Sequence, residues 1–180
     1  METENSSPPP ETQLKAWGSA EFDQFYIDED TFITKKPILI PFFSDNRLSV
    51  VQIACGSQHS LILANTGQVY SLGSPDEGQL GRSGDEKLPG LVEIPYRMDM
   101  ISAGESHSLA CNSQNGVVYF WGVYRNTHKG KMCEPMSLPS RLGETDFKKK
   151  TISKMISGSN HSMILCNGRV YTSGDPDTGV

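Results

Sequence analysis

Three histidine-serine pairs recur along the chain, and they are the residues whose types could do chemistry. They stand in three copies of one turn, Gly56 to Ser60, Gly104 to Ser108 and Gly158 to Ser162, with His59, His107 and His161 at equivalent places. Imidazole is a common metal ligand, but a metal needs its ligands within about 2.0–2.1 Å of one point. Equivalent positions in successive repeats do not converge in this way. We therefore predict no metal site, and we expect each histidine to brace its own turn by hydrogen bonding while the glycine allows a close approach.

The spacing of these turns indicates a repeated element of about 50 residues. The histidines are 48 and 54 residues apart, and each is followed by a short apolar run, a turn, and a Val-Tyr-x-x-Gly segment. Short strands with no 3.6-residue apolar period favour propeller blades over helical repeats. The sequence therefore predicts an all-β fold, a β-propeller of which about three blades are present.

Each unit contains a predicted hairpin. Asn167-Gly168 and Asn115-Gly116 follow apolar runs, and Asn-Gly tolerates the positive φ angles of a two-residue hairpin turn. In the first unit the loop is one residue different, at Asn65 to Gly67. A later segment, Leu88 to Ile94, contains a proline and is predicted to be an outer strand, because proline is tolerated at sheet edges. Trp17, Trp121 and the tyrosines of the Val-Tyr segments are predicted to lie in the core.

The repeat units are expected at about 14–50, 51–98, 99–152 and, incomplete, 153–180. Residues 1–13 are polar and proline-rich and are predicted to be a disordered tail. Trp17-Gly18 is similar to the end of a unit whose first half is missing, and the chain stops partway through a unit at Val180. Exposed strand edges would then make the free chain poorly stable.

Composition and missing motifs exclude several functions. A net charge of −5 and a pI of about 5.3 argue against a chain-wide attraction to nucleic acid. No apolar stretch approaches the roughly 18–20 residues that span a bilayer, so no membrane association is expected. There is no Gly-x-x-x-x-Gly-Lys-Ser/Thr loop, so we expect no direct nucleotide binding, and no cofactor is predicted. The four cysteines form no Cys-x-x-Cys pair and are predicted to be reduced core residues.

The combined pattern, Gly-x-x-His-Ser followed by Gly-x-Val-Tyr-x-x-Gly three times in phase, resembles the regulator of chromosome condensation repeat from about Leu14 to Val180. The resemblance implies a propeller that has seven blades in the family. The order of the units is similar to the first part of the family's nuclear exchange factor for the small GTPase Ran. It therefore implies a guanine nucleotide exchange factor, which performs no covalent chemistry and binds the nucleotide-free GTPase.

The same resemblance implies where the GTPase would bind. A wedge loop is expected at about Tyr124 to Glu134, and an acidic residue in the Gly-x-x-His turn is expected to contact the GTPase. Asn160 stands where the family protein carries such an acid, which puts full exchange activity in doubt. The predicted GTPase-binding residues are Glu105, Tyr124, Arg125, Asn126, Lys129, Lys131, Glu134 and Asn160.

Two other functions remain open at this point. The first is a protein-interaction scaffold built from the same repeats, with the wedge as an idle loop. The second is a propeller hydrolase that uses carboxylates and histidine, which equivalent repeat positions disfavour; Asp76-Glu77 fits ordinary turn chemistry instead. The resemblance also implies a nuclear, chromatin-associated location, with histones or chromatin as a further candidate partner. Because residues 1–14 hold no Lys or Arg, the cytoplasm stays open as a location.

Overall fold

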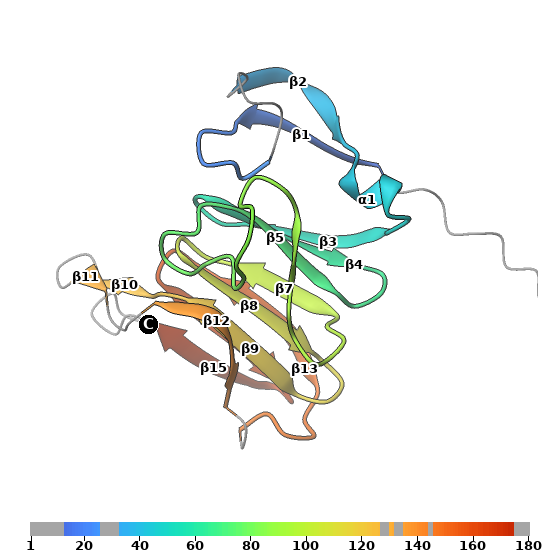
Figure 1. The fold of residues 1–180 in the computed structure, drawn as a ribbon. Coiled ribbons are helices and arrows are strands. Elements are labelled where there is room, and N and C mark those ends of the chain that lie inside the picture. Colours follow the sequence, from blue (N-terminus) through green and yellow to red (C-terminus); the bar gives the residue numbers. More distant parts are fainter. Residues whose placement is uncertain (1–12, 26–32, 127–129, 132–134, 144–145, 175–180) are drawn as a thin grey trace, which may run out of the picture.

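The structure, a computed structural model, describes residues 13–25, 33–126, 130–131, 135–143 and 146–174. Within these residues the regular structure is almost entirely antiparallel strand, with one short helix, α1 (Phe42–Asp45). The sheets are stacked one behind another along the chain (Figure 1). A hairpin of β1 (Leu14–Ser19) and β2 (Ile33–Ile40) lies at one end of the stack, and the sheet of β13, β14 and β15 lies at the other.

Three larger sheets correspond to the three Gly-x-x-His-Ser units. The first has the order β3-β4-β5-β6, with bounds Val50–Cys55, His59–Ala64, Val69–Gly73 and Gly90–Val92. The second has the order β7-β8-β9-β12, with bounds Met100–Ala103, His107–Asn112, Val117–Gly122 and Met136–Leu142. The third has the order β13-β14-β15, with bounds Ile152–Ser157, His161–Cys166 and Arg169–Gly174. A small hairpin, β10 (Arg125–Asn126) and β11 (Gly130–Lys131), lies between β9 and β12 in the chain.

The core lies between the stacked sheets rather than under one of them. Leu61 and Leu63 of β4 join the cluster that faces the second sheet, whereas Ile62 and Ala64 join the cluster on the other side. Successive side chains of a strand point to opposite faces, so a strand buried on both faces is a continuous apolar run. Strand β7 contacts β3 and β4 of the sheet before it and β13 of the sheet after it. Each sheet is therefore stabilised by its neighbours in the stack.

Turn chemistry explains where the hairpins bend. Asn167 and Gly168 have φ values of 47° and 76°, and Cys166 pairs with Arg169, so the predicted two-residue turn is confirmed. The second unit differs, because Asn112 pairs with Val117 across a four-residue turn. The predicted outer strand at 88–94 is confirmed as the shorter β6, which pairs with β5.

Two predicted core residues are not in the core. Trp121 is 0% exposed, but Trp17, at the matching place in β1, is 63% exposed, so the prediction for Trp17 was wrong. Trp121 is covered by a loop of the sheet before it, and among the described residues no such loop covers Trp17. Cys55 is also exposed, whereas Cys111 and Cys166 are buried. Burial and the nearby Asp99 raise the pKa of Cys111 to about 12, so this thiol stays protonated and unreactive.

No helix among the described residues is long and apolar enough to cross a membrane. The predicted disordered tail lies outside the described residues except for Gln13, which is exposed. The unit boundaries proposed from the sequence stay a prediction.

Candidate interaction face

The three Gly-x-x-His turns lie at the same end of their sheets, between β3 and β4, β7 and β8, and β13 and β14. Their backbones are alike. In each turn the glycine N–H donates to the histidine carbonyl oxygen at 2.9 Å, for the pairs Gly56 and His59, Gly104 and His107, and Gly158 and His161. The turn is therefore closed by the backbone, and the histidine ring is free to bond elsewhere.

The ring bonds across to the next sheet and not within its own turn. His59 Nε2 lies 2.8 Å from Ser108 Oγ, and His107 Nε2 lies 2.9 Å from Ser162 Oγ. This corrects the expectation that each histidine braces its own turn. The Ser108 hydroxyl donates to the Gln79 carbonyl oxygen at 2.8 Å, so the proton shared with His59 must come from Nε2–H.

These histidines are buried and neutral. His59 is 1% exposed and His107 is 0% exposed. Burial lowers the pKa of His59 to about 4, and burial with the neighbouring His59 and His161 lowers the pKa of His107 to about 3. Within the described residues no group of three or more His, Cys, Asp or Glu side chains could hold a metal ion. Their geometry is that of joints between sheets, so the surface chemistry must come from other residues.

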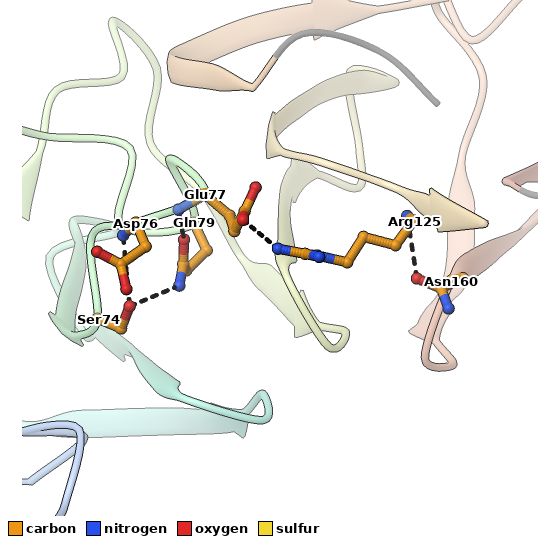
Figure 2. Close-up of polar contacts among 6 residues, drawn as sticks. All are labelled: Ser74, Asp76, Glu77, Gln79, Arg125 and Asn160. Atoms are coloured by element: carbon orange, nitrogen blue, oxygen red, sulfur yellow. Dashed lines mark hydrogen bonds and ion pairs between the residues drawn. The ribbon is translucent and has the colours of Figure 1, made fainter. Parts of the chain in front are cut away.

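A hydrogen-bonded loop, residues 73–81, projects beside the turns from the first sheet. Its Gln79 side chain is 1% exposed; Oε1 accepts the Glu77 N–H at 2.7 Å, and Nε2 donates to Ser74 Oγ at 3.3 Å (Figure 2). The Gln79 carbonyl oxygen also accepts the indole N–H of Trp121 at 2.8 Å. The loop is thus fastened to the second sheet, and it presents the Glu77 carboxylate at a fixed place.

Arg125 lies between this loop and the third sheet. Its guanidinium forms an ion pair with Glu77, and its backbone N–H donates to Asn160 Oδ1 at 3.0 Å (Figure 2). It is also the first residue of β10, which pairs with β11 and extends away from the stacked sheets (Figure 1). We call the surface formed by the three Gly-x-x-His turns, the loop 73–81 and this hairpin the turn face.

Glu105 stands in the second Gly-x-x-His turn. Its carboxylate accepts a hydrogen bond from the Ser159 hydroxyl, and its N–H donates to the Ser159 carbonyl oxygen at 3.1 Å. A polar hollow of about 280 Å³ separates Glu105 from Arg125 on the turn face. It is lined by Ser57, Gln58, Asp76, Glu77, Glu105, Ser106 and Arg125. The arrangement can bind a polar or charged surface, and it has the alternating charges that select an orientation.

The predicted contact residues divide into groups. Glu105, Arg125 and Asn160 lie together on the turn face. Tyr124 is only 9% exposed, with its ring centroid 4.5 Å from that of His107 and 4.8 Å from that of Phe120. It is therefore a core residue and not the exposed contact residue that was expected. Lys129 and Glu134 lie outside the described residues.

Asn126 and Lys131 are the remaining predicted contact residues in the described part of the chain. Both take part in the backbone pairing of β10 and β11. Glu77 was missed as a partner of Arg125, because the two residues are 48 positions apart and no sequence pattern reveals the contact.

Comparison with known proteins identifies the family. The model of the "Regulator of chromosome condensation (RCC1) repeat" matches residues 16–63 and 66–111, and a second model of that repeat matches residues 50–79. The chain belongs to the regulator of chromosome condensation repeat family. The repeats found in the sequence are therefore members of this family, and the stacked sheets are blades of its β-propeller.

Relatives of the chain include proteins named for regulation. The mouse regulator of chromosome condensation is 35% identical over 168 residues, which cover 90% of this chain and 38% of that protein. The guanine nucleotide exchange factor SRM1 of Saccharomyces cerevisiae is 30% identical over 92% of this chain and 36% of that protein. The chain thus spans less than two fifths of the length of these curated relatives.

A solved structure supports the fold. Prp20p from Saccharomyces cerevisiae, described with its binding properties to Gsp1p and histones, matches with a TM-score of 0.79 and 25% identity. The match covers 89% of this chain and 41% of that one. The three stacked sheets and the β1–β2 hairpin are accordingly a part of a β-propeller.

Proposed function

We propose that this chain belongs to a guanine nucleotide exchange factor for the small GTPase Ran. The turn face, with hairpin β10–β11 as the wedge, binds the nucleotide-free GTPase. Binding of the exchange protein and binding of the nucleotide to the GTPase weaken each other by the same ratio of affinities. A protein that prefers the empty GTPase therefore promotes nucleotide release. No covalent step is needed.

The observation that carries the proposal is the gathering of unlike charged groups on one face. Glu105 and the Glu77–Arg125 ion pair surround one hollow, and hairpin β10–β11 starts from Arg125. The histidines repeat where the sheets join, whereas these groups stand where the units differ. The names of SRM1 as an exchange factor and of Prp20p as a binder of Gsp1p agree with this proposal.

The energetics ask for a large, rigid surface. If a GTPase holds its nucleotide at picomolar strength, about 16 kcal/mol must be offset. Stable protein interfaces bury roughly 1,200–2,000 Å², and ordering loops on binding weakens association. The turn face has internally bonded loops, which lower that ordering cost.

The test is stopped-flow release of labelled GDP from Ran, with the intact full-length protein and its Glu105→Lys variant. We expect the wild type to accelerate release and the variant to lose most of that acceleration, because reversing the charge places a cation in the polar hollow. Glu93→Lys is the matched control, since Glu93 is an exposed acid at the opposite end of the sheets. No acceleration by the intact full-length wild type would contradict the proposal.

The alternative is a scaffold that binds a partner without exchange. Glu105→Lys combined with deletion of Lys129 to Cys133 separates the two functions. Unchanged partner binding by this variant would favour the scaffold, and lost binding together with lost GDP release would favour the exchange factor. We also propose a nuclear, chromatin-associated location with histones as a second partner class, on the resemblance and on the histone binding described for Prp20p.

A further inference from the structure

Arg125 is held from two sides at the base of hairpin β10–β11. Its guanidinium pairs with Glu77 on the loop of the first sheet, and its backbone N–H donates to Asn160 Oδ1 at the turn of the third sheet. Figure 2 shows Arg125 lying between these two partners. Arg125, which lies in the connection between β9 and β12 of the second sheet, therefore links all three sheets.

The Glu77 anchor, and the chain that enters the hairpin, are themselves fixed. The Glu77 N–H donates to the buried Gln79 side chain at 2.7 Å. Before the hairpin, the Val123 N–H donates to the Ser106 carbonyl oxygen at 2.8 Å, and the Val123 and Tyr124 side chains are 0% and 9% exposed. The direction of the hairpin is thus set by the two partners of its first residue, Arg125, and by the buried residues that precede it.

We propose that Glu77 and Asn160 are positioning residues: by holding Arg125 they fix the direction in which hairpin β10–β11 projects, and they act on the partner only through it. This inference rests on the proposed function for its purpose, but its geometry is a property of the free chain. The Asn160 oxygen is used by the Arg125 N–H, and the Glu77 side chain is 12% exposed. The Asn160 Oδ1 atom and the Glu77 carboxylate are therefore both engaged within the chain.

The role of Asn160 explains why an amide suffices where the resemblance implies an acid. The group that Arg125 needs is an acceptor oxygen, and a carboxylate oxygen would accept the same N–H. Asn160→Asp therefore keeps the anchor, whereas Asn160→Ala removes it and frees the start of β10. A hairpin that is already oriented loses less entropy on binding, so the loss of the anchor slows productive association.

The first measurement is amide hydrogen exchange of the free 180-residue chain by NMR, read at Asn126 and Gly130, which pair across β10 and β11. We expect exchange to rise about three- to tenfold in Asn160→Ala, where one hydrogen bond is lost. We expect a rise of about two- to fivefold in Glu77→Gln, where a partly exposed ion pair is lost. Asp76→Asn is the matched control for the free chain: it removes an exposed charge one residue away and should leave the exchange rates of the hairpin amides unchanged.

Rescue and partner binding complete the test. Asn160→Asp should keep the exchange rates of the wild type, and amides of β8 and β9 should stay protected in every variant, which excludes general unfolding. Association with nucleotide-free Ran should slow in Asn160→Ala by a factor similar to the exchange effect, and should be kept in Asn160→Asp.

Unchanged hairpin exchange in Asn160→Ala and Glu77→Gln would overturn the positioning role, even if partner binding fell, because the residues would then be direct contacts. If Ran binds to no variant, including the wild type, the proposed function fails, while exchange in the free chain still decides the positioning role.

Discussion

At the scale of single residues, the glycine of each Gly-x-x-His turn is required for space. The backbone passes so close to the histidine ring that a side chain cannot fit. At Gly104 an added Cβ would lie 2.0 Å from His107 Cε1 and 2.6 Å from the Gly158 carbonyl oxygen. One of these neighbours is backbone of the next sheet, so the clash cannot be relieved by a rotamer change alone.

We therefore expect Gly104→Ala to lower the free energy of unfolding by about 3 kcal/mol or more, the range of severe steric strain. Gly168→Ala is the comparison, because Gly168 has φ 76° and no atom within 4 Å of an added Cβ. It should cost about 1 kcal/mol for backbone strain alone. Urea unfolding followed by circular dichroism measures both, and equal losses would show that the close approach is not limiting.

The buried histidines predict a dependence of stability on acid. The folded pKa of His59, about 4, lies below the 6.5 of the unfolded chain, so the unfolded state binds more protons between these values. The stabilisation is complete above pH 6.5 and is lost as the pH falls toward 4. For His59 it amounts to about 3 kcal/mol.

The check is the free energy of unfolding against pH for the wild type and for His59→Gln, whose amide N–H can still donate to Ser108. The variant should lose part of the acid slope between pH 6.5 and 4. A slope identical to that of the wild type would mean that carboxylates alone cause the acid loss.

At the scale of elements, the joints between sheets are hydrogen-bonded as well as apolar. Ser108 accepts from His59 and donates to the Gln79 carbonyl oxygen, which also accepts from Trp121. Two elements of the first sheet, strand β4 and the loop 73–81, thus meet two strands of the second at one buried point. Removing one member leaves the others without partners in a place that water does not reach.

Ser108→Ala should therefore destabilise the chain by about 1–3 kcal/mol, the cost of an unsatisfied buried donor. A double-mutant cycle with His59→Phe tests the pairing, because the cost of Ser108→Ala should shrink once the histidine is gone. If the stability losses of the two single variants, measured by thermal unfolding, add up in the double variant, Ser108 and His59 do not stabilise the chain through the bond between them. Ser60→Ala is the control at the same place in the first unit.

Local signals in the sequence predicted local elements well. Asn167-Gly168 predicted its hairpin because the turn depends on those two residues alone. The prediction that His59 braces its own turn was wrong, because periodicity does not say whether the ring bonds within its own unit or to the next one. The Arg125–Glu77 pair was missed for a related reason: the loops that carry them differ between units, so no repeat aligns them. Trp17 shows that equal sequence does not ensure equal burial when the neighbouring element differs.

At the scale of the whole molecule, stability is distributed along a stack. Each sheet packs on the sheets before and after it, so its stability depends on nearest-neighbour contacts, as in repeat proteins. Trp121, which is 0% exposed and donates to the Gln79 carbonyl oxygen, fills the contact between the first and second sheets.

Trp121→Ala should cost about 3–5 kcal/mol, as for other large core truncations. We expect it also to separate the unfolding of strands β3–β6 from that of β13–β15, because it weakens the contact between β3–β6 and the second sheet, which lies between the two. Hydrogen exchange resolved by segment measures this, and a single unchanged transition would contradict it. Trp17→Ala, at an exposed tryptophan, is the control and should be nearly neutral.

The bonds from His59 to Ser108 and from His107 to Ser162 both run forward along the chain, from one unit to the next. The second unit is thus bonded to the unit before it through Ser108 and to the unit after it through His107. Duplication or loss of a complete unit would still place a histidine of one unit opposite a serine of the next, whereas a break inside a unit would not. The loops that take no part in these bonds can therefore vary without breaking a joint between units.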